Sequence, residues 1–478
     1  MTTDVSDPGT PMLDNVPSVT TQKFKQYVAS ISVSLGAFCA GTVLSWTSPG
    51  LAHITADGTN ITNASSFTPE LQPPGFRITK SEEALVGAML TIAALISAIP
   101  SGYLADKFGR KLVIIGLSLP FLLNYLLITF ARNVETVVAG RFFAGIGLGG
   151  DMRGGSHVHR GDIRAFQQGD VRMFLSCGIL FTCIVGSFAD WTMLSLILAV
   201  APVVFGVSFL FMPETPVYLV EKARVEEAEK TLKELRGSNY DVSAELKTIQ
   251  KEMLESQEKK ASIGDIVSDK ANVRAMISVM GVLAFQQFSG INAVVFYTVS
   301  IFRAAGTNMS PSLSAIIISL VQVVVSYISI LIVEKANRKF YLMVSSSGML
   351  LCLAGLGMFF HLKSLGVNVD HLAFIPLGST VLFMVSFSLG YGPVPWMLIS
   401  EVFAPEIKGV ASGVAILANW VFAFIVTFFF PIINANLGDH VTFYIFAFVM
   451  ACGTIFVHFV VPETRGKSLV EIQEYLSR

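Results

Sequence analysis

The stretch LVGAMLTIAALISAIPSGYLADKFGRK, residues 85–111, decides what kind of protein this is. Residues 84–105 carry no charge, and the basic cluster DKFGRK then ends the run. An uncharged run of this length matches the roughly 20 residues that a helix needs to cross about 30 Å of hydrocarbon. The stretch is therefore predicted to be a membrane-spanning helix that ends in a basic loop.

Comparable uncharged runs recur along the whole chain, at residues 26–52, 112–131, 191–213, 275–302, 372–400 and 409–438. Of the 478 residues, 53% are hydrophobic and 14% are charged, and the mean hydropathy is +0.63. A soluble domain carries about 25% charged residues. We therefore expect an all-α polytopic membrane protein with twelve spans. In the fourth and fifth spans the apolar pattern is incomplete.

The net charge of −1 gives no field that would attract nucleic acid, and no nucleic-acid partner is expected. The sequence shows neither a nucleophile–base pair nor a phosphate-binding loop, so it is predicted not to be an enzyme and to need no cofactor. The lipid bilayer is the expected surrounding.

The distribution of Lys and Arg predicts the orientation in the membrane. The loops at 106–111, 213–270 and 334–339 are basic or highly charged, and the alternate loops are not. The positive-inside rule then places both termini in the cytoplasm, with the plasma membrane as the expected location. The loops predicted to lie outside hold three N-x-[ST] glycosylation sequons, at Asn60, Asn63 and Asn308.

Charged motifs repeat in two halves of the chain. DKFGRK (106–111) returns as EKANRK (334–339), 228 residues later, and PETP (213–216) returns as PETR (462–465). Single clusters of this kind could merely stop translocation, but two pairs in register indicate a parallel repeat of six-helix bundles. The expected organisation is a disordered N-terminus (1–22), an N-terminal bundle (23–213), a helical linker (214–270), a C-terminal bundle (271–462) and a tail (463–478).

Polar side chains interrupt three of the predicted C-terminal spans. Span seven reads AFQQFSGINAVVFY (284–297), span ten reads GYGPVPWMLISEVF (390–403), and span eleven holds Asn419 and Trp420. Side chains that form hydrogen bonds are costly in hydrocarbon unless they face a cavity or a partner. Amides and indoles are uncharged donors and acceptors suited to sugar hydroxyls, whereas a lone amide often only joins helices. The Pro and Gly residues of span ten predict a broken helix.

Together GRF (140–142), D-x-x-GR-K (106–111), PETP, QQFSGINAVVFY (286–297), GPVPW (392–396) and PETRGKSL (462–469) resemble the sugar porters of the major facilitator superfamily. Within that family the chain is most similar to facilitative glucose transporters and insect trehalose transporters. The resemblance implies two pseudo-symmetric six-helix bundles around a central sugar site. A single chain is expected to be the functional unit.

The resemblance also implies roles for individual residues. It implies substrate contacts by Gln286, Gln287, Asn292, Gln322, Trp396, Asn419 and Trp420. It implies a cytoplasmic gating network, with ion pairs between the halves, made of Asp106, Arg110, Arg141, Glu214, Arg338, Glu401, Glu463 and Arg465.

Three functions are compatible with this sequence. The first span carries no acidic residue, which favours facilitated diffusion of a hexose or trehalose over proton-coupled symport. A non-transporting sugar sensor is the third reading, and the short predicted tails argue against it. The residues do not separate hexose from trehalose.

Residues 151–172 break the pattern. DMRGGSHVHRGD (151–162) places charges where span four should finish. A metal site at His157, His159 and Asp162 lacks further ligands. One possible coding sequence, read one nucleotide later, gives ICVVAPMYIGEI, the text that the resemblance implies here. We interpret 151–172 as a frameshifted segment that impairs insertion and transport, because each charge costs about 2.5–3.5 kcal/mol at mid-membrane.

Overall fold

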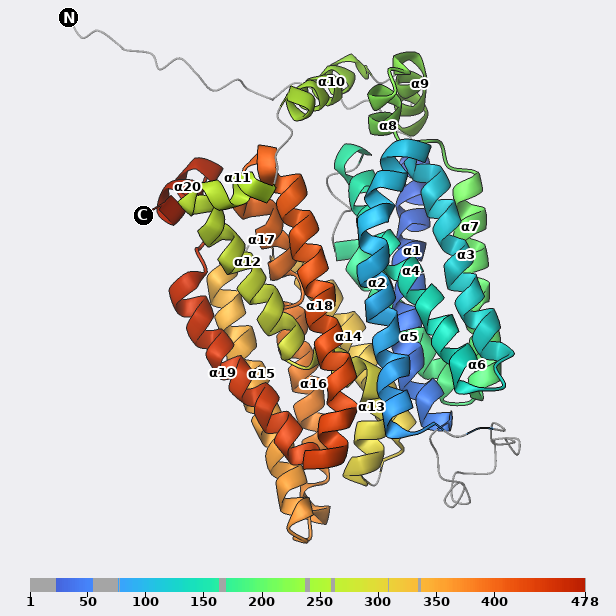
Figure 1. The fold of residues 1–478 in the computed structure, drawn as a ribbon, viewed down its shortest axis with the longest axis vertical. Helices are drawn as coiled ribbons and strands as arrows, with labels where there is room; N and C mark the ends of the chain where they lie inside the picture. The colour runs from blue at the N-terminus through green and yellow to red at the C-terminus, as the bar shows by residue number, and fades with distance from the viewer. Residues whose placement is uncertain are drawn as a thin grey trace, which may run out of the picture.

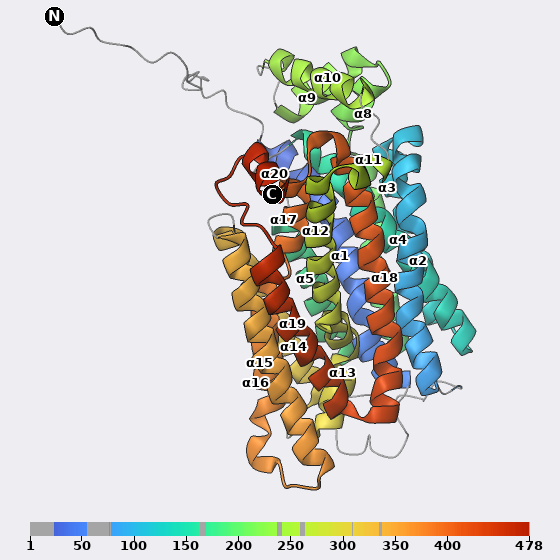
Figure 2. The same cartoon turned by 60° about the vertical axis from the view of Figure 1, so that its left-hand side comes forward.

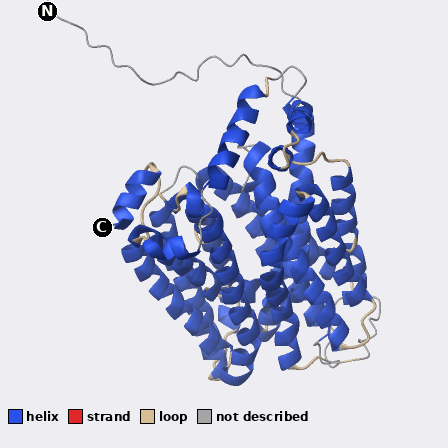
Figure 3. Cartoon of the chain, turned by 45° about the horizontal axis from the view of Figure 1, so that its top comes forward, coloured by secondary structure: helices blue, strands red, loops and turns tan. Residues whose placement is uncertain are grey.

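The computed structural model describes residues 23–54, 76, 78–162, 169–236, 241–258, 263–307, 309–333 and 337–477. Within these ranges the regular structure is helical and includes no strand (Figure 3). The long helices form two groups that lie side by side (Figure 1), which we call the N half and the C half. The three sequons and the predicted N-terminal segment 1–22 lie outside the described residues.

The N half consists of α1 (Lys23–Ile54), α2 (Lys80–Phe108), α3 (Arg110–Thr129), α4 (Val134–Asp162), α5 (Gly169–Gly186), α6 (Trp191–Leu198) and α7 (Val200–Leu210). The C half consists of α12 (Lys270–Phe288), α13 (Ile291–Ala305), α14 (Pro311–Val333), α15 (Arg338–Ser364), the 3-10 helix η1 (Asp370–Leu372), α16 (Phe374–Leu389), α17 (Val394–Val402), α18 (Pro405–Leu437) and α19 (Asp439–Val460).

Ten helical segments of the described chain are long and apolar enough to cross a membrane. In this count α6 with α7, α12 with α13, and η1 with α16 and α17 each make one span. The other two spans of the twelve are α4, which contains the aberrant segment, and α5, whose apolar part is the shorter Val171–Gly186. The prediction of an all-α, twelve-helix membrane protein is confirmed.

Two of these spans are broken at the positions where the sequence loosens the helix. Between α12 and α13, Gly290 adopts φ +83°, a left-handed conformation that favours glycine. Between α16 and α17 the chain turns through Gly390–Pro393, because Pro393 and Pro395 lack the N–H that helix continuation needs. The predicted break in span ten is confirmed.

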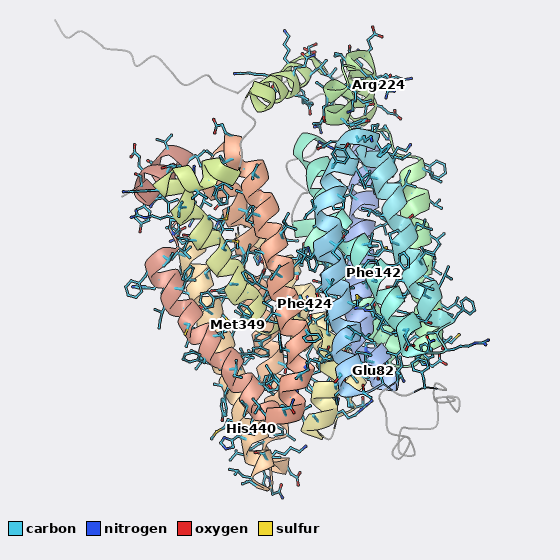
Figure 4. The ribbon with its side chains drawn as sticks, in the orientation of Figure 1. Glu82, Phe142, Arg224, Met349, Phe424 and His440 are labelled. Atoms are coloured by element: carbon cyan, nitrogen blue, oxygen red, sulfur yellow. The ribbon has the colours of Figure 1, made fainter. Side chains whose placement is uncertain are left out.

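Four short helices connect the halves: α8 (Pro216–Glu221), α9 (Val225–Arg236), α10 (Ser243–Glu258) and α11 (Ile263–Ser268). The first three lie beyond one end of the long helices, and Figure 2 shows them above that end from a second direction. We call this the linker end. The tail helix α20 (Leu469–Ser477) lies on the C half at the same end (Figure 1). Figure 4 labels Arg224 in the linker, and Glu82 and His440 at the opposite end.

The two halves contact each other through hydrogen bonds at mid-depth and toward the end opposite the linker. In Figure 4, Phe424 of α18 lies along the line where the halves meet. The bonds are Val299 N to Ser48 Oγ (3.1 Å), Arg303 Nη1 to the Ala52 carbonyl (3.1 Å), Thr91 with Thr427 (3.5 Å), Ser319 to Cys183 (3.2 Å) and Ser176 with Ser326 (3.2 Å). These contacts close the molecule on the side away from the linker.

Candidate functional site

The break between α12 and α13 brings three amides close together inside the C half. Gln286 and Gln287 occupy the last turn of α12, and Asn292 lies in the first turn of α13. Only a glycine fits at position 290 in this short turn. Its φ of +83° disfavours other residues, and a Cβ there would lie 2.6 Å from the ring of Phe446. The local sequence thus positions the amides through a turn that packs against α19.

Three of the predicted substrate residues form one hydrogen-bonded chain. The Nδ2 of Asn292 donates to Oε1 of Gln287 at 2.6 Å. The Nε2 of Gln287 donates in turn to Oδ1 of Asn419 on α18 at 2.7 Å. Gln287 and Asn419 are both buried, with 6% and 4% of their surface exposed. Gln287 therefore couples three helices through its single amide group.

Gln286 ties α12 to the broken segment between α16 and α17. Its Nε2 donates to the carbonyl of Tyr391 at 2.5 Å, and the N–H of Tyr391 donates to Ser345 Oγ at 3.2 Å. The Oε1 of Gln286 is buried and has no hydrogen-bond partner among the described residues. One end of this amide thus anchors the break, and the other end is an acceptor without a donor.

The other predicted substrate residues contribute polar atoms without bonding to this chain of amides. Gln322 on α14 and Trp420 on α18 are buried, and neither Oε1 of Gln322 nor Nε1 of Trp420 has a partner in the described structure. Trp396 on α17 is half-buried and packs against the apolar core. Buried polar atoms without partners are uncommon in folded proteins, and each one invites an explanation.

Sequence reasoning missed two hydroxyl groups beside the break. The side-chain oxygens of Ser388 and Tyr391 are buried and also have no partner within the described residues. Both residues are fully buried, with 0% of their surface exposed. In the sequence, Tyr391 stands between the two glycines of GYGP, at the predicted break in span ten. A tyrosine hydroxyl at such a break is the feature that could have identified it as a site residue.

The predicted gating residues form separate clusters, one in each half. At the linker end of the N half, Oε1 of Glu214 accepts the backbone N–H groups of Arg110 and Lys111, both at 3.1 Å. Asp106 is exposed at the end of α2, near the carboxylate of Glu221. Burial and the charge of Asp106 raise the pKa of Glu221 above its usual value.

At the linker end of the C half, Glu463 accepts the backbone N–H groups of Arg338 and Lys339 at 2.9 and 3.2 Å. The Arg338 guanidinium pairs with Glu401 at 3.0 Å, and Arg465 Nη1 donates to Asn337 Oδ1 at 3.1 Å. These contacts, like those of Glu214, stay within one half. The expected ion pairs between the halves do not occur among the residues described here.

The structure corrects the prediction for Arg141. Its side chain is fully buried within the N half, and its Nη1 and Nη2 donate to the Val43 carbonyl (2.8 Å) and to Thr47 Oγ1 (2.7 Å) on α1. The guanidinium also lies 5.6 Å from the Trp46 ring centroid. Arg141 is two turns from the start of α4, at the end opposite the linker. It therefore joins α4 to α1 and takes no part in a gate at the linker end.

The aberrant segment has no described side-chain environment over residues 151–170. Its last residue, Arg172, is described and belongs to α5, and its guanidinium lies 5.7 Å from the centroid of the Phe387 ring on α16. This cation was not among the predicted site residues.

Comparison with known proteins gives consistent results over most of the chain. A family model described as "Sugar (and other) transporter" matches residues 51–476. The "Facilitated trehalose transporter Tret1-2 homolog" of Drosophila simulans is 36% identical over 460 residues, covering 94% of this chain and 90% of the relative. The "Facilitated trehalose transporter Tret1" of Culex quinquefasciatus is 35% identical over 457 residues, covering 94% of this chain and 85% of the relative.

Among solved structures, the chain is similar to the inward open conformation of the xylose transporter XylE from E. coli. The TM-score is 0.74 at 20% identity, with 94% of this chain and 99% of that chain covered. XylE bound to 6-bromo-6-deoxy-D-glucose is described as a major facilitator superfamily proton:xylose symporter. It gives a TM-score of 0.72 at 20% identity, with 95% of this chain and 99% of that chain covered. At this identity the likeness shows the fold.

Proposed function

The chain belongs to the sugar (and other) transporter family, and from this premise we propose that it moves a hexose or trehalose across a membrane by facilitated diffusion. As a member of this family it is a multi-pass membrane sugar transporter and not an enzyme.

The observation that carries the proposal is the set of uncharged polar groups in the core of the C half. Gln287 joins Asn292 and Asn419, while Gln286, Gln322 and Trp420 each keep a buried polar atom without a partner in the described residues. Sugar hydroxyls both donate and accept hydrogen bonds, so a polyol supplies what these acceptors and this donor lack. The indole of Trp396 offers an apolar face to a sugar ring.

The two relatives described above favour trehalose as the substrate, since both are named facilitated trehalose transporters. A hexose offers the same kind of hydroxyl groups. The proposed site is therefore defined by polyol chemistry, and uptake measurements separate the two sugars.

Facilitated diffusion is favoured by the scarcity of titratable groups inside the spans. A proton symporter needs a group whose charge is neutralised during each cycle. Helix α1 holds no carboxylate, and the buried carboxylate of Glu83 on α2 pairs with Lys80 at 2.9 Å near the end opposite the linker. An ion-paired carboxylate remote from the amides is a poor coupling group.

Alternating access would proceed by rocking of residues 23–213 against residues 271–462. The hydrogen bonds between the halves close the end opposite the linker, which corresponds to a state facing the linker side. The clusters around Glu214 and Glu463 would come together when the linker end closes, and ion pairs between the halves would then form. Arg141 is not part of this gate.

The charged linker and the basic loops support a cytoplasmic location for the linker end and for both termini, by the positive-inside rule. We place the protein in the plasma membrane, with Asn60, Asn63 and Asn308 as glycosylation sites in outer loops. One chain contains both halves of the proposed path, so a monomer is the proposed functional unit.

Uptake of radiolabelled glucose and trehalose in oocytes tests the function directly. We compare the chain as it stands with a version in which residues 151–172 are replaced by the family-like residues that the resemblance implies, which begin with ICVVAPMYIGEI. Water-injected oocytes give the baseline. Saturable uptake of one sugar that never exceeds the outside concentration supports the proposal. Uphill accumulation that an uncoupler abolishes would overturn facilitated diffusion, and binding without flux in the restored form would favour a sensor.

A further inference from the structure

The break between α16 and α17 frees a backbone group that an intact helix would pair. In a regular α-helix the Phe387 carbonyl accepts the N–H of Tyr391, four residues later. Here the Phe387 carbonyl instead accepts the N–H of Gly392 at 2.8 Å. Tyr391 is fully buried, so its freed N–H needs another acceptor.

A serine of the neighbouring helix α15 supplies that acceptor. The Oγ of Ser345 accepts the N–H of Tyr391 at 3.2 Å, and the same hydroxyl donates to the Ser386 carbonyl at 2.7 Å. Ser345 is itself buried, with 2% of its surface exposed. One hydroxyl therefore joins the last turn of α16 to the segment that breaks the helix.

Helix α15 and the break also approach each other closely at this point. A Cβ on Gly390 would lie 2.4 Å from the Cβ of Ser345 and 2.6 Å from the Tyr341 carbonyl oxygen, so a glycine is required there. The dihedral angles of Gly390, φ −122° and ψ −76°, lie outside the helical range. Helix α15 thus supports the chain exactly where α16 stops supporting it.

The residue that Ser345 holds also holds an amide of the proposed sugar site. The Tyr391 carbonyl accepts Nε2 of Gln286 at 2.5 Å. With its Nε2 fixed in this way, Gln286 presents Oε1 as a buried acceptor that has no partner among the described residues. A shift of Tyr391 therefore moves the amide of Gln286, and with it the acceptor proposed to meet a sugar hydroxyl.

We propose that Ser345 is a positioning residue of the sugar site: its hydroxyl fixes the Tyr391 carbonyl, which in turn orients the amide of Gln286. The inference rests on the proposed function. It adds a residue from α15, a helix that contributes none of the predicted substrate contacts. Ser345 acts through Gln286 and needs no contact with the sugar.

A double-mutant cycle tests the proposal by equilibrium binding to the purified full chain. The probe is labelled glucose or trehalose, whichever the uptake assay identifies, and the variants are made in the version of the chain that takes it up. Ser345→Ala should weaken binding about fivefold, the size of one lost hydrogen bond. In a chain that already carries Gln286→Ala, the same change should alter affinity by less than about twofold, because no oriented amide is left to lose.

Ser346→Ala is the matched control. Ser346 is the next residue of α15 and is also fully buried, but its hydroxyl bonds the Met343 carbonyl (3.1 Å) and Thr454 Oγ1 (2.8 Å). Its loss should keep sugar affinity within about twofold of the parent chain, with or without Gln286→Ala. A general loosening of α15 would instead weaken binding in both serine variants and would persist in the Gln286→Ala chain.

The outcomes separate this inference from the proposed function. If Ser345→Ala binds the sugar as wild type does, or weakens binding equally with and without Gln286→Ala, the positioning role is wrong. It is also wrong if Gln286→Ala alone has wild-type affinity. If neither the chain as it stands nor the version replaced at 151–172 binds glucose or trehalose, the proposed function fails, and the positioning role fails with it.

Discussion

Glu463 caps the first turn of α15 by accepting the backbone N–H of Arg338 at 2.9 Å. Glu214 stands in the same relation to Arg110 at the start of α3 in the other half. A carboxylate at a helix N-terminus satisfies free N–H groups and interacts favourably with the helix dipole. In each half, the Glu of the repeated PET motif therefore caps the helix that begins at the Arg-Lys pair of the other repeated motif.

Removing the charge of either cap should destabilise the protein. We expect Glu214→Gln and Glu463→Gln each to lower the free energy of unfolding by about 1–2 kcal/mol, the range known for N-terminal caps and charges. Thermal unfolding of the detergent-purified protein measures the effect. Glu229→Gln, on the exposed face of α9, is the matched control and should change stability by less than about 0.5 kcal/mol. Equal effects in cap and control variants would contradict the capping role.

Gln287→Ala should impair sugar binding more than a change at any other single amide. The substitution leaves both Asn292 and Asn419 without the partner that now holds them. Loss of one or two hydrogen bonds to a buried polar group corresponds to about 1–3 kcal/mol, or roughly 5- to 150-fold in affinity.

Equilibrium binding of the labelled sugar measures this change. Asn436→Ala, near the exposed end of α18, is the control and should bind normally. Gln286→Ala and Asn292→Ala should also weaken binding, but by less than Gln287→Ala. Wild-type affinity in all three site variants would remove the proposed sugar site.

Transport should not depend on the proton gradient, and Glu83→Gln tests this at the one buried carboxylate of the described spans. Its partner Lys80 is largely exposed, so the neutral variant loses an ion pair but no coupling group. Uptake by wild type and by Glu83→Gln should respond equally little to an uncoupler. An accumulation ratio above one in wild type that Glu83→Gln abolishes would assign proton coupling to Glu83.

The linker should be more stable in mild acid because of Glu221. Burial and the charge of Asp106 raise the pKa of this carboxyl above its ordinary value of 4.5, so the folded state binds the proton more tightly than the unfolded chain. The ionised group therefore costs stability at neutral pH. This cost begins to fall when the pH drops to the raised pKa, and it is gone once the pH is below the ordinary value.

Glu221→Gln should remove this dependence. Its unfolding temperature should exceed that of wild type at neutral pH, and the difference should shrink as the pH falls toward the ordinary carboxyl range. Differential scanning fluorimetry at a series of pH values measures it. A constant difference at every pH would show that ionisation of Glu221 is not the cause.

Restoring residues 151–172 to the family text should raise the amount of inserted protein. Span four then loses the charges at Arg153, Arg160 and Asp162, each of which costs about 2.5–3.5 kcal/mol at mid-membrane. Surface expression of a tagged chain, normalised to total protein, compares the two versions. Mass spectra of peptides from residues 149–174 of the native protein show which amino-acid sequence the cell produces there. Equal surface expression would mean that the segment as written is tolerated.

Much of the fold could be predicted because it depends on local chemistry. Uncharged runs of spanning length, the missing N–H groups of Pro393 and Pro395, and the conformational freedom of Gly290 each act within a few residues. Hydropathy and backbone bonding in a membrane leave few alternatives to a helix, so the twelve spans and the break in span ten could be predicted from the sequence, whereas the break at Gly290 was not. The repeated charged motifs likewise indicated two related halves.

The partners of the polar residues were decided only by the tertiary structure. The sequence did not show that Arg141 bonds the Val43 carbonyl instead of joining a gate, that Gln287 links Asn292 with Asn419, or that Arg172 lies on Gly392. Each contact joins helices that are distant in sequence. Side-chain partners depend on how helices rotate and cross when they pack, and a hydrogen bond needs its atoms placed to within a few tenths of an ångström.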